Sequence, residues 1–135
     1  MTINAPNRAL LTAQPYTELV RGFQWQIPET FNIGAATTGF WAKADPDRIA
    51  IIDEQEDGCI REWSFLALDR LANRFANALT AAGARVGDRI GVHLPQRVET
   101  AAAHIGALKA GLITVPLFEL FGEDALNFRL RTAEA

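Results

Sequence analysis

The chain has 135 residues, of which 49% are apolar and 21% charged, with a net charge of −3 and a single cysteine, Cys59. This composition is typical of a folded domain, and the interleaved charges give no basic stripe for nucleic acid or an anionic membrane surface. A single cysteine excludes an internal disulfide. Residues 1–8 lack the basic and then apolar segments of a signal peptide, and no apolar run approaches the ~20 residues of a membrane span. We therefore expect a cytoplasmic protein.

The first part of the chain, residues 1–30, is predicted to be a leader segment. It begins with a loose stretch that contains two prolines, and a short helix is expected over residues 16–25. A second helix is predicted from Asn32, a good N-cap, to about Ala44. The spacing predicts that its buried face comprises Ile33, Ala36, Thr37, Phe40 and Trp41.

A β-hairpin is predicted next. Two short strands, residues 49–53 and 60–63, flank an acidic tip that contains Asp57 followed by Gly58. An Asp-Gly pair between two strand-forming runs is typical of a tight hairpin turn.

An amphipathic helix follows the hairpin, with Ser64 as its N-cap and Gly83 at its end. Apolar residues recur at spacings of three and four between residues 68 and 79, so one face of this helix is expected to be buried. The core positions predicted from this spacing, together with one from the next helix, are Leu71, Phe75, Leu79 and Ile105.

The last third of the chain alternates strands and helices. Strands are predicted at residues 90–94 and 113–116, with an alanine-rich helix over 97–110 between them, on which Lys109 is expected to cap the C-terminal end. A final helix is predicted over 124–131. This order predicts an α/β fold with a βαβ unit in a largely parallel sheet, flanked by helices. Two parallel strands are too few for a stable sheet, so we expect the opening of a larger α/β protein.

One segment has the glycine spacing of a phosphate-binding loop. Four residues separate Gly34 from Gly39, but Phe40 and Trp41 follow where such a loop needs Lys and then Ser or Thr. We therefore predict an ordinary helix.

The titratable residues give no active site from local sequence. The carboxylates at the hairpin tip are expected to be solvated, because a tip offers neither burial nor a neighbour that separates their pKa values. His93, His104 and Cys59 form no pattern of metal ligands and no nucleophile–base pair.

Four stretches, in order, resemble a known family. They are residues 63–68 (WSFLAL), 87–95 (GDRIGVHLP), 108–116 (LKAGLITVP) and 118–130, which begins FELFGEDAL. These stretches are similar to the first core motif, the following strand, the second core motif and its continuation in the acyl-adenylate-forming superfamily of AMP-dependent synthetases and ligases. The last stretch resembles the continuation found in acetyl- and medium-chain acyl-CoA synthetases.

The resemblance implies an AMP-forming acid–CoA ligase as the parent enzyme. Such an enzyme activates a carboxylic acid with ATP and Mg²⁺ to an acyl-adenylate, and then transfers the acyl group to coenzyme A. Residues 31–135 are expected to be the N-terminal part of its large domain, truncated before the ATP-binding loop. The family's catalytic lysine lies downstream, so the resemblance implies no catalytic residue, no metal ligand and no tightly bound cofactor in this fragment. We expect the fragment to be inactive and to self-associate.

One residue is a candidate coenzyme A contact, namely Phe118. The resemblance implies this role because acetyl-CoA synthetases carry a Phe-Gly-Gly turn here that approaches the coenzyme A nucleotide. Glu119 and Leu120 replace the two glycines in this chain, and their side chains would hinder a close approach of the backbone. The alternative role for Phe118 is a core residue at the end of a strand.

Two other functions stay open at this point. Within the same family, a ligase can hand its acyl group to a carrier protein. In a different class, a non-catalytic α/β interaction module would bind a partner chain through an uncovered sheet edge. The identity of the carboxylic acid is not encoded in these motifs.

Overall fold

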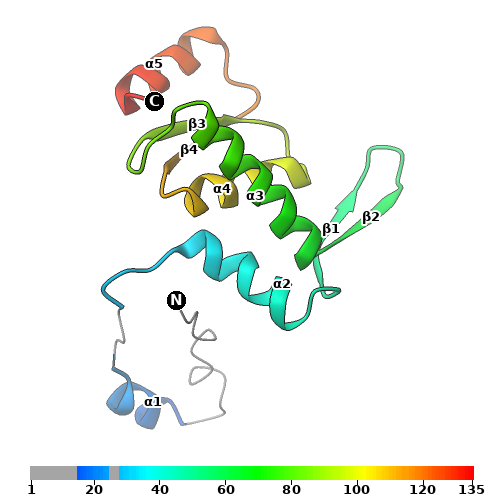
Figure 1. Cartoon of the computed structure of the whole chain (residues 1–135), viewed down its shortest axis with the longest axis vertical. Helices are drawn as coiled ribbons and strands as arrows, with labels where there is room; N and C mark the ends of the chain where they lie inside the picture. Colours follow the sequence, from blue (N-terminus) through cyan, green and yellow to red (C-terminus); the bar gives the residue numbers. More distant parts are fainter. Residues whose placement is uncertain (1–14, 25–27) are drawn as a thin grey trace. The chain divides into compact units, whose positions relative to one another are not determined.

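The computed structural model describes residues 15–24 and 28–135 (Figure 1). The chain divides into two units, Met1–Phe31 and Asn32–Ala135. In the first unit, helix α1 spans Tyr16–Gly22. Its first backbone hydrogen bonds run from the N–H groups of Glu18 and Leu19 to the carbonyl of Pro15. The rest of the predicted leader, residues 1–14 and 25–27, lies outside the described residues.

The second unit begins with a helix that contains a π-helical stretch, η2 (Ala35–Gly39), continued by α2 (Phe40–Ala44). The predicted N-cap is confirmed, because the side-chain oxygen of Asn32 accepts from the backbone N–H of Ala35 at 2.8 Å. The helix therefore begins where the sequence predicted.

The predicted buried face of this helix is confirmed only in part, because Ala36, Phe40 and Trp41 are half-buried whereas Ile33 and Thr37 are exposed. Ile33 is 55% exposed, and the buried residues are instead Gly34, Thr38 and Ala42. A Cβ at Gly34 would lie 2.7 Å from both the backbone oxygen of Ile105 and the backbone nitrogen of Lys109. Only a glycine permits this approach, so the smallest side chains and not the most apolar ones face the neighbouring helix. The wider π turn also shifts the face away from regular α-helical spacing.

Strands β1 (Ile49–Glu54) and β2 (Ile60–Ser64) form the predicted hairpin. They pair antiparallel, with Glu54 opposite Ile60, and the register shifts once near the start of β1. Gly58 closes the turn at a φ of +80°, which L side chains rarely adopt, so the Asp-Gly pair has the expected role.

Helix α3 (Phe65–Ala81) begins at its predicted N-cap, because the Ser64 hydroxyl oxygen accepts from the N–H of Ala67 at 3.2 Å. It lies beside α4 (Val98–Lys109) (Figure 1), and the two helices approach closely at Gly106, where a Cβ would lie 2.6 Å from the backbone oxygen of Ala72. The core cluster contains Leu68, Val98 and Ala102. Among the predicted core residues, Leu71 and Ile105 pack against this cluster and are partly buried, as are Phe75 and Leu79.

Strands β3 (Arg89–His93) and β4 (Ile113–Leu117) pair in parallel, and α4 connects them along the chain. This arrangement confirms the predicted βαβ unit. The final helix, α5 (Glu123–Ala133), packs on the strands at Gly91, where a Cβ would lie 2.7 Å from a methyl carbon of Leu130. The fold class is therefore α/β, with a hairpin, a parallel βαβ unit and flanking helices. In the described part of the chain, no helix has the length and apolar character needed to cross a membrane.

Candidate functional site

The carboxyl ends of β3 and β4 carry the candidate residue Phe118. It follows Leu117, the last residue of β4, which lies opposite His93, the last residue of β3. Ligands of open α/β sheets gather beyond such strand ends. The Phe118 side chain is 57% exposed, so it is not a core residue in this structure.

Phe118 opens a four-residue turn. The backbone N–H of Phe121 donates to the carbonyl of Phe118 at 3.0 Å, and the two rings meet edge to face with centroids 5.8 Å apart. The guanidinium of Arg129, on α5, lies 3.9 Å from the centroid of the Phe121 ring. Leu120, at the tip of the turn, is 76% exposed. This turn therefore presents an aromatic face to solvent at the strand ends.

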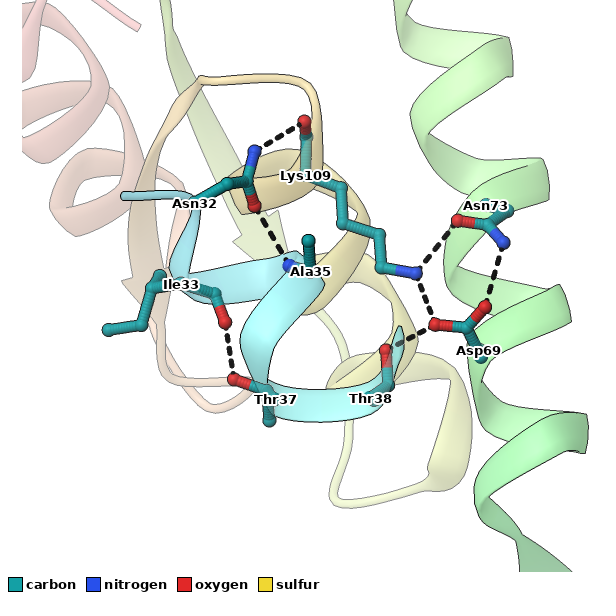
Figure 2. Close-up of polar contacts among 8 residues, drawn as sticks. All are labelled: Asn32, Ile33, Ala35, Thr37, Thr38, Asp69, Asn73 and Lys109. Carbon is teal, nitrogen blue, oxygen red and sulfur yellow. Dashed lines mark hydrogen bonds and ion pairs between the residues drawn. The ribbon is translucent and has the colours of Figure 1, made fainter. Parts of the chain in front are cut away.

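The clearest polar cluster lies elsewhere, between three helices (Figure 2). The Lys109 ammonium of α4 donates to a carboxylate oxygen of Asp69 on α3, and to the side-chain oxygen of Asn73 at 2.8 Å. Asp69 also accepts from the Thr38 hydroxyl at 2.6 Å and from the Asn73 amide at 2.9 Å. We call these four residues the Asp69–Lys109 network. The side chains of the ion pair are only 14% and 11% exposed.

The electrostatics of this network favour a charged carboxylate. Burial by itself raises the pKa of Asp69, but the hydrogen bonds from Lys109 and Thr38 and the positive charge of Lys109 outweigh burial. The pKa of Asp69 therefore lies below its ordinary value. Every polar atom of the pair that points inward has a partner, so the network has the chemistry of a structural junction and not of an acid–base pair.

The predicted role of Lys109 as the cap of its own helix is wrong, because its side chain extends across to α3. The C-terminal end of α4 is capped instead by Asn32, whose side-chain amide donates to the Lys109 carbonyl at 3.0 Å (Figure 2). Asn32 thus hydrogen-bonds a free N–H group at the beginning of one helix and a carbonyl at the end of another. Sequence reasoning missed this junction because the partners that lie on different helices are 31 to 77 residues apart.

An open groove of about 510 Å³ lies between β1 and the first half of α4. Its walls include Ile51, Asp53, Arg97, Thr100 and His104, which mix apolar groups with both signs of charge. Such a lining does not select one ligand class, so we assign none to it.

The hairpin-tip carboxylates have no partner that would make them an acid–base pair. The backbone N–H of Cys59 donates to Asp57 and lowers the pKa of that carboxyl, which is fully exposed. Cys59 is itself an exposed thiol. Within residues 15–24 and 28–135, no three His, Cys, Asp or Glu side chains gather to hold a metal ion.

A sequence model of the family described as AMP-binding enzyme matches residues 40–135. The chain belongs to the AMP-binding enzyme family. Among curated members, the medium-chain fatty-acid–CoA ligase of Escherichia coli K12 is 33% identical over 104 residues, and an acetyl-coenzyme A synthetase of Magnetococcus marinus is 35% identical over 89 residues. These matches cover 75% and 65% of this chain, but only 18% and 14% of the two relatives.

Solved structures with a similar fold include an acyl-CoA synthetase and the N-terminal domain of FACL13. An acyl-CoA synthetase of Brucella canis superposes with a TM-score of 0.75 at 25% identity, over 96% of this chain and 23% of that protein. The N-terminal domain of FACL13 from Mycobacterium tuberculosis superposes with a TM-score of 0.69 at 28% identity, over 78% of this chain and 26% of that domain. The resemblance to the acyl-adenylate-forming superfamily is therefore confirmed. The boundaries of the leader and the contact at Phe118 stay predictions.

Proposed function

We propose that this chain is the opening part of the large domain of an AMP-forming acid–CoA ligase. The observation that carries the proposal is the family match over residues 40–135, together with relatives named as a fatty-acid–CoA ligase and an acetyl-coenzyme A synthetase. The chain spans 14% to 18% of those relatives, so the activity belongs to a longer protein of which these residues build one part.

The proposed reaction has two steps. An oxygen of the substrate carboxylate attacks the α-phosphorus of ATP, and the bond to pyrophosphate breaks, which leaves an acyl-adenylate. The sulfur of coenzyme A then attacks the acyl carbon, and AMP leaves as the thioester forms. Magnesium, when bound, offsets charge on the phosphate oxygens. We assign no magnesium ligand to the described residues, because they contain no cluster that would hold one.

This chain contributes scaffold and one proposed ligand contact. The hairpin, α3 and the βαβ unit are the proposed scaffold, and the Asp69–Lys109 network joins α3 to α4 and to the helix that carries Thr38. Phe118 would contact the nucleotide end of coenzyme A, because its exposed ring follows the carboxyl end of β4 and a flat aromatic face can stack on adenine. The chain alone is proposed to be inactive, because the family resemblance places the ATP-binding loop and the catalytic lysine downstream of these residues.

A direct test begins with the gene. A Ser/Thr/Gly-rich loop ending in Pro-Lys-Gly, encoded within about a hundred codons after residue 135, would supply the phosphate-binding machinery that this family uses. The full-length protein should then exchange pyrophosphate into ATP in the presence of a carboxylic acid, and form a thioester when coenzyme A is added. A stop codon directly after residue 135 would favour the non-catalytic interaction module instead.

The thiol acceptor is the point on which the nearest alternative differs. We propose coenzyme A, since coenzyme A stands in the names of both relatives described above. Transfer to a carrier protein and not to coenzyme A would contradict this choice while leaving the adenylation step intact.

The cytoplasmic location also stays a prediction, based on the single cysteine.

A further inference from the structure

The turn that carries Phe118 is attached to the neighbouring strand by a side chain. His93 is the last residue of β3, and its Nε2 lies 3.2 Å from the backbone oxygen of Glu119, the second residue of the turn. The strand register places His93 opposite Leu117, directly before Phe118. The imidazole therefore spans the two strand ends at the point where the chain leaves the sheet.

The same turn is attached on its other side to α5. Arg129 stacks its guanidinium on the Phe121 ring, and its Nη1 also donates to the carbonyl of Ala125 at 3.0 Å, which holds the guanidinium in place. The Phe121 ring in turn meets Phe118 edge to face. His93 thus contacts a backbone carbonyl of the turn, and Arg129 contacts an aromatic ring of the turn.

From this arrangement we infer that His93 is a positioning residue, which fixes the turn and so places the Phe118 ring for the nucleotide end of coenzyme A. The inference rests on the proposed function for its ligand, and on the described contacts for its geometry. A carbonyl oxygen only accepts hydrogen bonds, so Nε2 of His93 must carry a proton. Without that bond, the exposed turn keeps the backbone bond from Phe121 to Phe118, the contact between their rings and the stacked Arg129, but loses its link to β3 through His93.

The experiment compares three variants with matched side chains. His93→Leu keeps an apolar body but removes the donor, and His93→Gln restores an N–H donor. His104→Leu is the control, because this histidine lies on α4 and lines the groove beside β1, away from the turn. In the full-length enzyme, we expect His93→Leu to raise KM for coenzyme A about twofold to tenfold, the range that one neutral hydrogen bond supplies. Pyrophosphate exchange should stay unchanged, and His93→Gln should recover most of the loss.

Two readouts on the full-length protein need no activity. Long-range ¹H–¹⁵N correlations should show that His93 carries its proton on Nε2. Hydrogen exchange of the Phe121 amide should become about twofold to tenfold faster in His93→Leu, but not in His104→Leu. A neutral ring protonated on Nδ1 alone, or unchanged exchange at Phe121, would overturn the inference.

The kinetic outcomes separate this inference from the proposed function. An unchanged KM for coenzyme A in His93→Leu, an equal loss in both half-reactions, or no recovery by His93→Gln would overturn the positioning role. If the full-length wild-type enzyme forms no thioester, the proposed function fails. In that case the tautomer of His93 and the exchange of the Phe121 amide still decide whether His93 holds the turn.

Discussion

Replacing Asp69 by Asn should destabilise the fold more than any exposed charge deletion. The substitution keeps the side-chain volume and an acceptor for Thr38, but leaves the Lys109 ammonium, only 11% exposed, without a counter-ion. Removing one partner of a buried ion pair typically costs ~3–5 kcal/mol. Asn73 still accepts from Lys109, so we expect the lower end, about 3 kcal/mol. For a chain of this length, that change lowers Tm by roughly 10 °C.

The assay is thermal or urea denaturation of the purified chain, followed by circular dichroism. The matched control is Glu99→Gln, which breaks the ion pair between Arg97 and Glu99, whose side chains are 54% and 52% exposed. An exposed pair contributes less than about 1 kcal/mol. If Asp69→Asn and Glu99→Gln shifted the midpoint by the same amount, the network would not stabilise the helix junction and the reasoning would be refuted.

The pH dependence of this stability has a definite sign. The folded-state pKa of Asp69 lies below its ordinary value of 3.8, so its contribution is present above that value and is lost as the pH falls through the folded-state pKa. The wild-type chain should therefore lose stability more steeply than Asp69→Asn when the pH falls from above 3.8 to below it. The exposed Asp57 also has a lowered pKa, but it is present in both proteins and cancels in the comparison. Parallel curves would contradict the assignment.

Four further predictions follow from the structure. Gly34→Ala should destabilise the chain by ~1–3 kcal/mol, because a Cβ would overlap the α4 backbone. Gly39→Ala should be neutral or stabilising, because its Cβ would lie 3.7 Å from the nearest atom, on Asp69. Equal unfolding midpoints for the two variants would refute this prediction. Phe118→Ala in the full-length enzyme should impair only the coenzyme A step, and equal loss in pyrophosphate exchange would indicate a structural role. The isolated chain should show no carboxylate-dependent pyrophosphate exchange, and robust exchange free of host ligase would contradict its scaffold role. It should also self-associate, because Ile113, Phe118 and Leu120 are each more than half exposed; a monodisperse monomer in sedimentation that binds no hydrophobic dye would argue against this.

The order of helices and strands followed from the sequence because local signals determine it. The Ser64 and Asn32 caps act on N–H groups three residues away, and the Asp57-Gly58 pair acts within a single turn. The spacing of apolar residues predicted α3, and the strand–helix–strand order predicted the parallel βαβ unit. Each of these signals is complete within a few residues, so no knowledge of the rest of the fold is required.

Contacts between distant segments were decided only by the tertiary structure. The helix over residues 33–44 buries Gly34 and Thr38 and not Ile33, because α4 approaches too closely for a larger side chain. Lys109 pairs with Asp69, 40 residues away, although its position at a helix end predicted a cap. Phe118 is exposed although an aromatic residue at a strand end favours burial. In each case a neighbour that is remote in sequence determines the environment of the side chain, and periodicity along one helix carries no information about that neighbour.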